Sequence, residues 1–302
     1  MKLKNPNNHK IESNKIENKK QKTTTTSLAE LGSWDIKTTK LFRKYLIKYE
    51  SLPSYKKILN SMIKFKDMYQ PIVKGSTYID LFSRLAVINE EKRLKRIQVY
   101  MNKRDIISTF DEIHGKKLVI TSRGRKIFYK DLPLTKLRKE KWNGWWTIIM
   151  YDFPETIRTK RVFIRRKLMS FGFGTPQISI LASPLPLEKG MQKLIEGENL
   201  KKFVWVLKAK SVLGMKNHEV AKKAWPIDEI NQLYNQLLKI LPKIKKDKIL
   251  IQEWRTYFLA IDHADPYLPF ELLPKNWLGE TCAHKFVKLS RFGTLKSLLR
   301  KL

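Results

Sequence analysis

Residues 142–181 read WNGWWTIIMYDFPETIRTKRVFIRRKLMSFGFGTPQISIL, and this stretch decides how the middle of the chain folds. Its first part, WTIIMYDF, is a continuous apolar run, which is typical of a strand buried inside a sheet. A basic segment follows in which Val162, Leu168 and Met169 lie at roughly helical spacing, and Gly172 is suited to the position just after a helix. A second apolar run, TPQISILASP, comes next. We therefore expect a strand, a helix and a second strand in this order.

The same pattern continues in the residues that follow. LPLEKGMQKLIEG predicts a helix that ends at Gly197, and KKFVWVLKA predicts another strand. Two strand–helix units on a small sheet indicate a ferredoxin-like α/β sandwich over residues 142–222. With the helical segments on either side of it, this sandwich assigns the chain to the α+β class.

The whole chain is strongly basic. Its 302 residues include 62 Lys and Arg against 28 Asp and Glu, which gives a formal net charge of +34. Lysines and arginines that neutralise phosphates release condensed counterions, so a polyanion is the natural partner. Double-stranded DNA is the partner that we favour; an anionic membrane surface, or no partner, is the alternative.

Cysteine content and hydropathy exclude further classes. Cys282 is the only cysteine, so neither an intramolecular disulfide nor a cysteine-based metal site can form. No apolar run approaches the roughly 20 residues that span a bilayer. The N-terminal residues lack the hydrophobic segment of a secretory signal. We expect a cytoplasmic protein that does not bind membranes.

The first 133 residues divide into two parts. Residues 1–36 are rich in Lys, Asn and Thr and poor in apolar residues, which predicts a disordered basic tail. Residues 37–133 show helical periodicity instead, followed by two strand-like runs around a turn at His114-Gly115. A helix, a hairpin and a further basic helix in this order predict a winged helix-turn-helix module.

The helix before the hairpin is expected over Asn89–Lys103. Asn89 is a plausible N-cap, and Leu94, Ile97 and Met101 share one face. Basic residues on the opposite face would enter the major groove of DNA, and those of the hairpin would touch phosphates. The alternative is a solvated basic face without a partner. The candidate DNA contacts are Lys92, Lys95, Arg96, Lys103, Lys116, Lys117, Arg123 and Arg125.

Residues 130–141 predict a linker before the sandwich. Residues 223–302, directly after the sandwich, predict a helical C-terminal domain. A broad apolar stripe at helical spacing is best explained by packing into a core. Its members are Trp225, Ile230, Leu233, Tyr234, Leu237, Leu238 and Leu241. A Pro-rich segment, DPYLPFELLPKNWLGE, separates a second helix from a final amphipathic segment.

Two of these segments carry a resemblance to a known family. DPYLPFELLPKNWLGE resembles the C-terminal signature of PaaX-type transcriptional repressors, and the stretch from WNGWW through YDFPE to GFG and QISI resembles their central domain. That domain is in turn similar to the ferredoxin-like CRISPR-associated endonuclease (the second Cas protein). The resemblance implies a winged helix, a ferredoxin-like dimerisation domain and a helical C-terminal domain. It also implies a homodimer on palindromic DNA and an acyl-CoA-type effector, for which we find no residue pattern.

Asp152 is the residue on which an alternative function depends. The resemblance to the CRISPR nucleases implies that this aspartate binds a divalent cation between two protomers. Asp152 would then bind Mg²⁺, alone or together with Glu155. The other interpretation is structural: Asp152 caps the following helix or pairs with Arg158 or Arg161. We favour a regulator without catalytic activity and without a cofactor. A Mg²⁺-dependent nuclease is the alternative, and a non-enzymatic nucleic-acid-binding adaptor is a third hypothesis. No other catalytic site is expected, since the five histidines are scattered and no phosphate-binding glycine loop is present.

Overall fold

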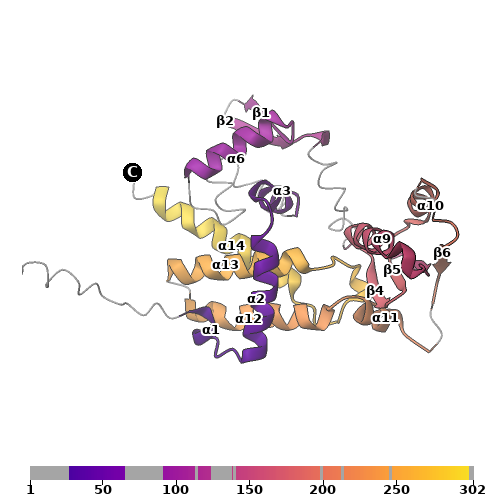
Figure 1. Cartoon of the computed structure of the whole chain (residues 1–302). Coiled ribbons are helices and arrows are strands. Elements are labelled where there is room, and N and C mark those ends of the chain that lie inside the picture. Colours follow the sequence, from indigo (N-terminus) through magenta and orange to yellow (C-terminus); the bar gives the residue numbers. More distant parts are fainter. Residues whose placement is uncertain are drawn as a thin grey trace, which may run out of the picture.

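The computed structural model describes residues 27–64, 91–112, 115–123, 138, 141–197, 200–211, 214–244 and 247–298. Three groups of elements are visible in Figure 1: a hairpin beside two helices at the top, a set of long helices below, and a sheet with its own helices to one side. Helices and an antiparallel sheet therefore coexist in separate groups, as the α+β class predicts.

The sheet at the side is built from four antiparallel strands in the order β4-β5-β3-β6. A 3₁₀ turn (Glu155–Ile157) and α9 connect the first two strands along the chain, and α10 connects the last two. The elements are β3 (Trp146–Tyr151), α9 (Arg158–Ser170), β4 (Gly174–Gln177), β5 (Ile180–Ser183), α10 (Glu188–Gly197) and β6 (Val204–Ala209).

One expectation for this sheet is wrong. The run TPQISILASP was expected to be a single strand, but it is divided into β4 and β5 by a tight turn at Ile178 and Ser179. The amide of Tyr151 donates to the carbonyl of Ser179 at 3.1 Å, and its hydroxyl donates to the carbonyl of Ile178 at 2.8 Å. The turn contains neither Gly nor Asn, the residues that usually mark a two-residue hairpin loop, so local sequence gave no signal for it.

The two faces of the sheet pack against different neighbours. Ile149 and Tyr151 of β3 point to the face covered by α9 and α10, where Ile164, Leu168 and Met191 complete a core. Successive strand residues alternate between faces, so Trp146 lies on the opposite side. There it packs with α11 (Asn217–Ala224) and with the Pro-rich segment. This second core joins the sheet to the C-terminal helices.

The hairpin group contains α3 (Ser54–Lys64), α6 (Glu91–Lys103), β1 (Ile107–Glu112) and β2 (Gly115–Ile120). The two strands are antiparallel partners over their whole length. Among the described side chains of this group, six are buried in one core. These are Ile58, Leu59, Leu94, Met101, Ile106 and Ile107.

The largest core belongs to the long helices. They are α2 (Ile36–Glu50), α12 (Ile227–Ile244), α13 (Lys248–Ala264) and α14 (Gly279–Leu298), with η2 (Phe270–Leu272) in the Pro-rich segment. Stacked rings of Trp254, Phe258 and Phe286 run through the centre. The expected stripe on α12 is buried at Ile230, Leu233, Tyr234, Leu237 and Leu241, whereas Trp225 and Leu238 are half-buried. Cys282 is fully buried here and donates to the carbonyl of Tyr234.

The N-terminal part of this core differs from the expected domain boundaries. Residues 28–36 were expected in a disordered tail, but α1 (Leu28–Leu31) is capped by Ser27 and buries Leu28 against the C-terminal helices. Helix α2 was expected in the winged module, yet its Phe42, Tyr45 and Tyr49 are buried in the same helical core. An apolar stripe identifies the face of a helix that is buried but not the element that covers it, which explains the difference.

Within the described ranges, no helix combines the length and apolar character needed to cross a bilayer. The expected tail before residue 27 lies outside the described residues.

Candidate nucleic-acid interface

Helix α6 has one buried and one cationic face. Leu94 and Met101, seven residues apart, are buried against α3 and β1, and Ile97 is half-buried between them. Side chains on the opposite side therefore point away from the protein. The exposed cations of this side are Lys92, Lys95, Arg96 and Lys103, all four predicted from the sequence, and Arg93 is exposed on the flank nearer α3.

Two arginines of this region are held by neighbours. Arg93, which was not among the predicted contacts, donates to the hydroxyl of Ser54 at the start of α3 over 3.0 Å. Arg96 donates from Nε to the carbonyl of Lys92, one turn earlier, over 3.3 Å. The second arrangement leaves the far end of the Arg96 guanidinium directed outward. Such partial anchoring reduces the rotamer entropy that an arginine loses when it binds a phosphate or a base.

An aromatic pair borders the cationic face. Tyr100 is 41% exposed, and its ring lies 5.2 Å from that of Tyr55 on α3. The guanidinium carbon of Arg104 is 5.7 Å from the ring centre of Tyr100, within the range of a cation–π contact. Val99, one residue before Tyr100, is 52% exposed. Helix α6 thus presents cations together with apolar surface, the combination that a groove of DNA can accommodate.

The hairpin is attached to the end of α6 by backbone hydrogen bonds. Asp105 adopts a left-handed conformation (φ 52°) that ends the helix, and Ile106 then donates to the carbonyl of Met101 at 2.8 Å. Thr121, just after β2, donates to the carbonyl of Ile106 at 3.1 Å. These bonds fix the position of the hairpin relative to the cationic face of α6.

The remaining predicted contacts are described only in part. Lys116 and Lys117 lie in β2, opposite Asp111 and Phe110 of β1, but their side chains are outside the description. Arg123 is exposed just beyond β2. The predicted contact Arg125 and the predicted N-cap Asn89 lie outside the described residues.

Asp152 does not have the structural role expected for it. Its side chain is exposed at the end of β3, and its amide donates to the carbonyl of Phe203. Neither Arg158 nor Arg161 pairs with it, because both arginines lie near Glu155, at 3.7 and 3.3 Å. Helix α9 begins without a side-chain cap. Among the described residues, no three His, Cys, Asp or Glu side chains meet in a way that would hold a metal ion.

Strand β6 exposes two large apolar side chains on the sheet face opposite α9 and α10, which α11 and the Pro-rich segment cover only in part. Trp205 of β6 is 64% exposed and pairs with Met150 of β3, so that both side chains point to the same face. Leu207, also exposed, pairs with Ile148 in the same way. Ile178 in the β4–β5 turn is 82% exposed. Strand β6 is moreover an edge strand of the sheet.

The three tryptophans at the start of the sheet domain differ in environment. Trp146 is fully buried and donates from its indole nitrogen to Asn217 at 2.9 Å. The ring of Trp142 lies edge-on to it at 5.1 Å. Trp145 is partly exposed, with the ammonium of Lys208 over its ring at 4.8 Å. Trp142 and Trp146 therefore pack at the junction between the sheet and the elements that follow it, whereas Trp145 lies at the surface.

A buried cation ties the expected linker to the C-terminal domain. Arg138 donates to both carboxylate oxygens of Asp265, at 2.5 and 3.2 Å, and to Glu280 at 2.9 Å. Its Nε donates to the carbonyl of Leu268 at 3.3 Å, and its guanidinium lies 4.4 Å from the ring centre of Tyr267. Burial alone would lower the pKa of Arg138, but the two carboxylates outweigh burial and hold this pKa above its ordinary value.

Two tyrosines complete this buried cluster. Tyr234 donates its hydroxyl proton to Asp265, and Tyr267 donates to Asp262. Burial, reinforced by these carboxylates, raises the pKa of both tyrosines well above the ordinary value, so both hydroxyls stay protonated as donors. The segment that follows the hairpin group is therefore held at one point by a satisfied polar network. No sequence signal marked Arg138, because it lies in a run of basic residues that looks solvated.

Two family models match the chain in its central and C-terminal parts. The central Cas2-like domain of the PaaX protein matches residues 139–221, and the C-terminal domain of PaaX-like proteins matches residues 225–295. Together these ranges cover about half of the chain, and they coincide with the sheet domain and with the helices that follow it.

One curated relative agrees with this assignment. The chain is 24% identical over 196 residues to the transcriptional repressor PaaX of Escherichia coli K12, a match that covers 54% of this chain and 60% of the repressor. The chain therefore spans less than two thirds of the length of that relative. Among solved structures, the uncharacterized protein Rv0674 from Mycobacterium tuberculosis aligns with a TM-score of 0.49 and 17% identity, over 78% of this chain and 95% of that one.

Proposed function

The chain belongs to the PaaX-type family, and from this premise we propose that it is a DNA-binding transcriptional regulator that acts as a repressor in the cytoplasm. The observation that carries the proposal is the cationic face of α6, which lies opposite a fully apolar buried face and beside an antiparallel hairpin. A repressor needs no catalytic group, only occupancy of its operator.

The proposed mechanism separates affinity from sequence recognition. Lys92, Lys95 and Arg96 enter the major groove from α6, and arginine is suited there to donate two hydrogen bonds to guanine. Lys103, Arg123 and the hairpin lysines contact phosphates, which adds affinity that does not depend on sequence. The helix, hairpin and following basic turn support a winged helix-turn-helix assignment for this group.

We further propose that the regulator is a homodimer that binds a palindromic site. The strand order β4-β5-β3-β6, with α9 and α10 as the two connections, supports a ferredoxin-like sandwich for the central domain. Trp205 and Leu207 of the edge strand β6 stay exposed on the face opposite α9 and α10, and a second copy would bury these large apolar residues. Control by an acyl-CoA-type ligand is the part of the proposal that rests on the family alone.

The test is a binding experiment on DNA upstream of the protein's own gene. Fluorescent duplexes tiled across that region are titrated in excess random competitor, and one of them should bind at least about a thousandfold more tightly than random sequence. Changing Lys92, Lys95 and Arg96 to Ala should abolish this preference. The matched control changes Lys223, Lys239 and Lys285, which are exposed on other helices, and should retain it. Equal affinity for every duplex would refute the proposal.

A Mg²⁺-dependent nuclease is the second candidate function. It is favoured by the Cas2-like character of the central domain and by the exposed carboxylate of Asp152 at the end of β3. Two copies of the chain would have to bring two Asp152 side chains to one cation, since a hard metal needs several oxygen ligands. Incubation with RNA and DNA substrates and Mg²⁺ or Mn²⁺ tests this function. Cleavage that disappears in Asp152→Ala would establish it and would contradict a purely regulatory protein.

A further inference from the structure

The exposed face of helix α2 is rich in cations, which lie around two exposed isoleucines, Ile36 and Ile47. Its buried side, centred on Phe42 and Tyr45, packs into the helical core, so the opposite side faces outward. Five cations occur in fifteen residues, against a single acid within the helix, Glu50. The five cations, all exposed, are Lys37, Lys40, Arg43, Lys44 and Lys48.

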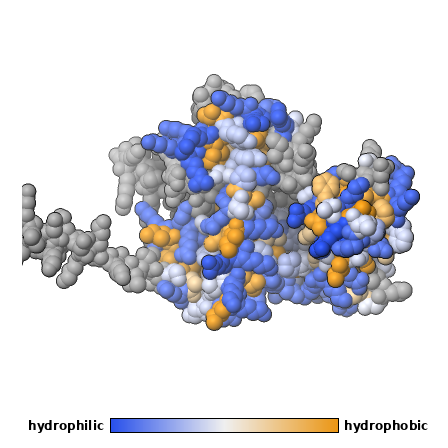
Figure 2. Space-filling view, viewed as in Figure 1, coloured by the Kyte–Doolittle hydropathy of each residue, from blue (hydrophilic) through white to orange (hydrophobic). Residues whose placement is uncertain are grey.

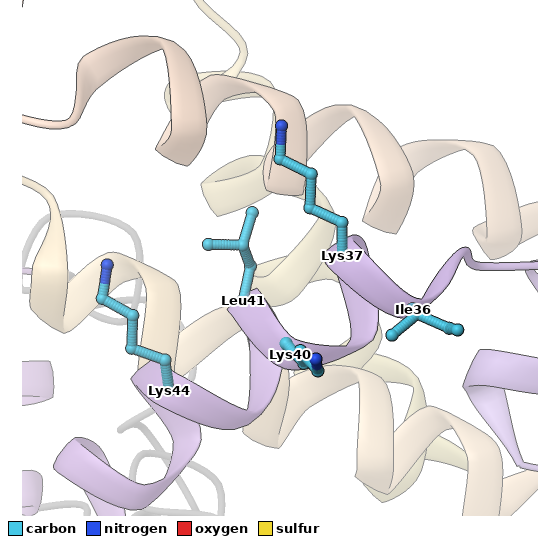
Figure 3. A pocket seen from close by; sticks show the side chains of 5 residues that line it. All are labelled: Ile36, Lys37, Lys40, Leu41 and Lys44. Atoms are coloured by element: carbon cyan, nitrogen blue, oxygen red, sulfur yellow. The ribbon is translucent and has the colours of Figure 1, made fainter.

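These cations are available for a partner. Among the described residues, only Lys44 of the five forms an ion pair, with Glu229 of α12 at 3.0 Å. Lys37, Lys40 and Lys44 also line a shallow pocket of about 470 Å³ together with Ile36 and Leu41. In Figure 3, Lys37 and Lys44 point to the same side of the helix as Leu41 does, whereas Lys40 projects from the adjacent side.

The cationic face of α2 lies on the same side of the molecule as α6. Figure 1 places both helices toward the viewer, with α2 below the hairpin group. Figure 2, seen from the same direction, shows hydrophilic residues interspersed with hydrophobic ones along this side of the molecule. DNA bound at α6 would therefore meet α2 if the duplex continued across this face.

We propose that the exposed face of α2 is a second DNA-binding surface, which contacts the phosphates of DNA that flanks the site recognised by α6. The inference rests on the proposed DNA-binding function and adds a surface outside the winged module. Lys37 to Lys48 extend about 16 Å along the helix, at a rise of 1.5 Å per residue. Each DNA strand presents a phosphate about every 3.4 Å of its axis, so several phosphates lie within reach of this row.

Charge distinguishes DNA from an acidic peptide as the partner. Ile36 and Ile47, which are 76% and 58% exposed, would also suit the apolar side of an acidic amphipathic helix. However, the five cations outnumber these two aliphatic residues, and a single exposed acid of the same helix, Glu50, opposes them. Contacts to phosphate depend on charge and not on sequence, which is what an unspecialised row of lysines supplies.

The experiment measures the salt dependence of binding to a random-sequence duplex of about 40 base pairs, well beyond one half-site. Lys37, Lys40, Arg43 and Lys48 are changed to Gln in the full-length protein. Each lost phosphate contact lowers the slope of log affinity against log salt by about 0.9, so the slope should fall by about 2 or more. The matched control carries Lys223→Gln, Lys239→Gln, Lys285→Gln and Lys288→Gln, which remove the same charge from exposed positions on α11, α12 and α14.

The outcomes separate the inference from the function on which it rests. A smaller slope for the α2 variant than for the control, with unchanged preference for the operator, supports the inference. Equal slopes for the two variants overturn it, and the α2 face would then have to serve an acidic protein. If operator preference fails in the tiled-duplex experiment, the proposed function falls, while the slope on random DNA still tests α2. A wild-type protein that binds no duplex overturns both.

Discussion

The arginines of α6 and the buried Arg138 show two opposite uses of the same side chain. Arg96 projects from an exposed helix face and makes one hydrogen bond, to a carbonyl of its own helix. Arg138, in contrast, is buried and donates to two carboxylates and a backbone carbonyl. The first guanidinium retains donors for an external partner, whereas the second has its donors directed at groups of the C-terminal domain.

The difference shows that the number of cations available to a partner cannot be read from the net charge, because some cations are buried. A buried guanidinium requires compensation by acids, which removes both charges from the surface. An exposed guanidinium beside few acids costs little in folding and remains available for binding. A substitution of the buried arginine should therefore lower stability, whereas a substitution on the exposed face of α6 should lower DNA affinity. The following predictions test this separation.

The largest effect is expected from Arg138→Ala. Removal of the guanidinium leaves Asp265 buried without its counter-charge, which should cost about 3–5 kcal/mol of unfolding free energy. Denaturant unfolding followed by tryptophan fluorescence measures the loss. Arg158→Ala is the matched control, since Arg158 pairs with Glu155 at an exposed site and should lose no more than about 1 kcal/mol. Equal losses would show that burial does not distinguish the two arginines.

A somewhat smaller and local effect is expected from Leu94→Ala. The change empties part of the six-residue core under α6 and should cost about 2–4 kcal/mol. Hydrogen exchange should become faster in α6, β1 and β2 but not in α12 or α13, because no residue of this core belongs to the helical core. Faster exchange in all five elements would mean that the two regions unfold as one unit.

Gly174→Ala should destabilise the junction between the sheet and α11. A Cβ at this position would lie 2.5 Å from a ring carbon of Trp225 and 2.8 Å from the Cβ of Ala224, so one of them must move. We expect a loss of about 1–3 kcal/mol. Gly190→Ala in α10 is the control: its Cβ meets nothing within 4 Å, and the helix should gain roughly 0.5–1 kcal/mol. A loss at Gly190 would contradict the packing argument.

The smallest effect on stability is expected from Arg96→Ala on α6. Its side chain is exposed, so the unfolding free energy should change by no more than about 0.5 kcal/mol. Affinity for the operator should nevertheless fall by about 1–3 kcal/mol if the arginine contacts a base. The two quantities are measured by denaturant unfolding and by fluorescence anisotropy. A change in stability without a change in affinity would reverse the comparison.

Local elements were predictable wherever the pattern of apolar residues determines them. Strand β3, helix α9 and the stripe on α12 follow the periodicity of their side chains. Gly172 ends α9 with a left-handed conformation (φ 81°), as its position in the sequence predicts. The cationic face of α6 was predictable for the same reason, since burial of Leu94 and Met101 fixes which side chains point outward.

The partners of these elements could not be predicted from local patterns. The apolar face of α2 was evident, but nothing in its sequence showed that α12 and α13 cover it. Arg138 resembles the basic residues around it, and only the fold brings it to Asp265, which lies 127 positions away. The β4–β5 turn has no glycine or asparagine that would predict it. It is stabilised by a contact distant in the sequence, the hydrogen bond from the hydroxyl of Tyr151.

Because Cys282 is buried, dyes can be attached to introduced cysteines while the native cysteine stays in place. Burial raises the pKa of this thiol, and no other cysteine exists in the sequence. A cysteine introduced at an exposed position would therefore react with a maleimide dye while Cys282 stays protected in the folded protein. Dyes at Asn102 on α6 and Thr159 on α9 would report the distance between the two groups of elements by energy transfer. Changes in that distance as DNA or a candidate effector is added could be followed without first removing a native cysteine.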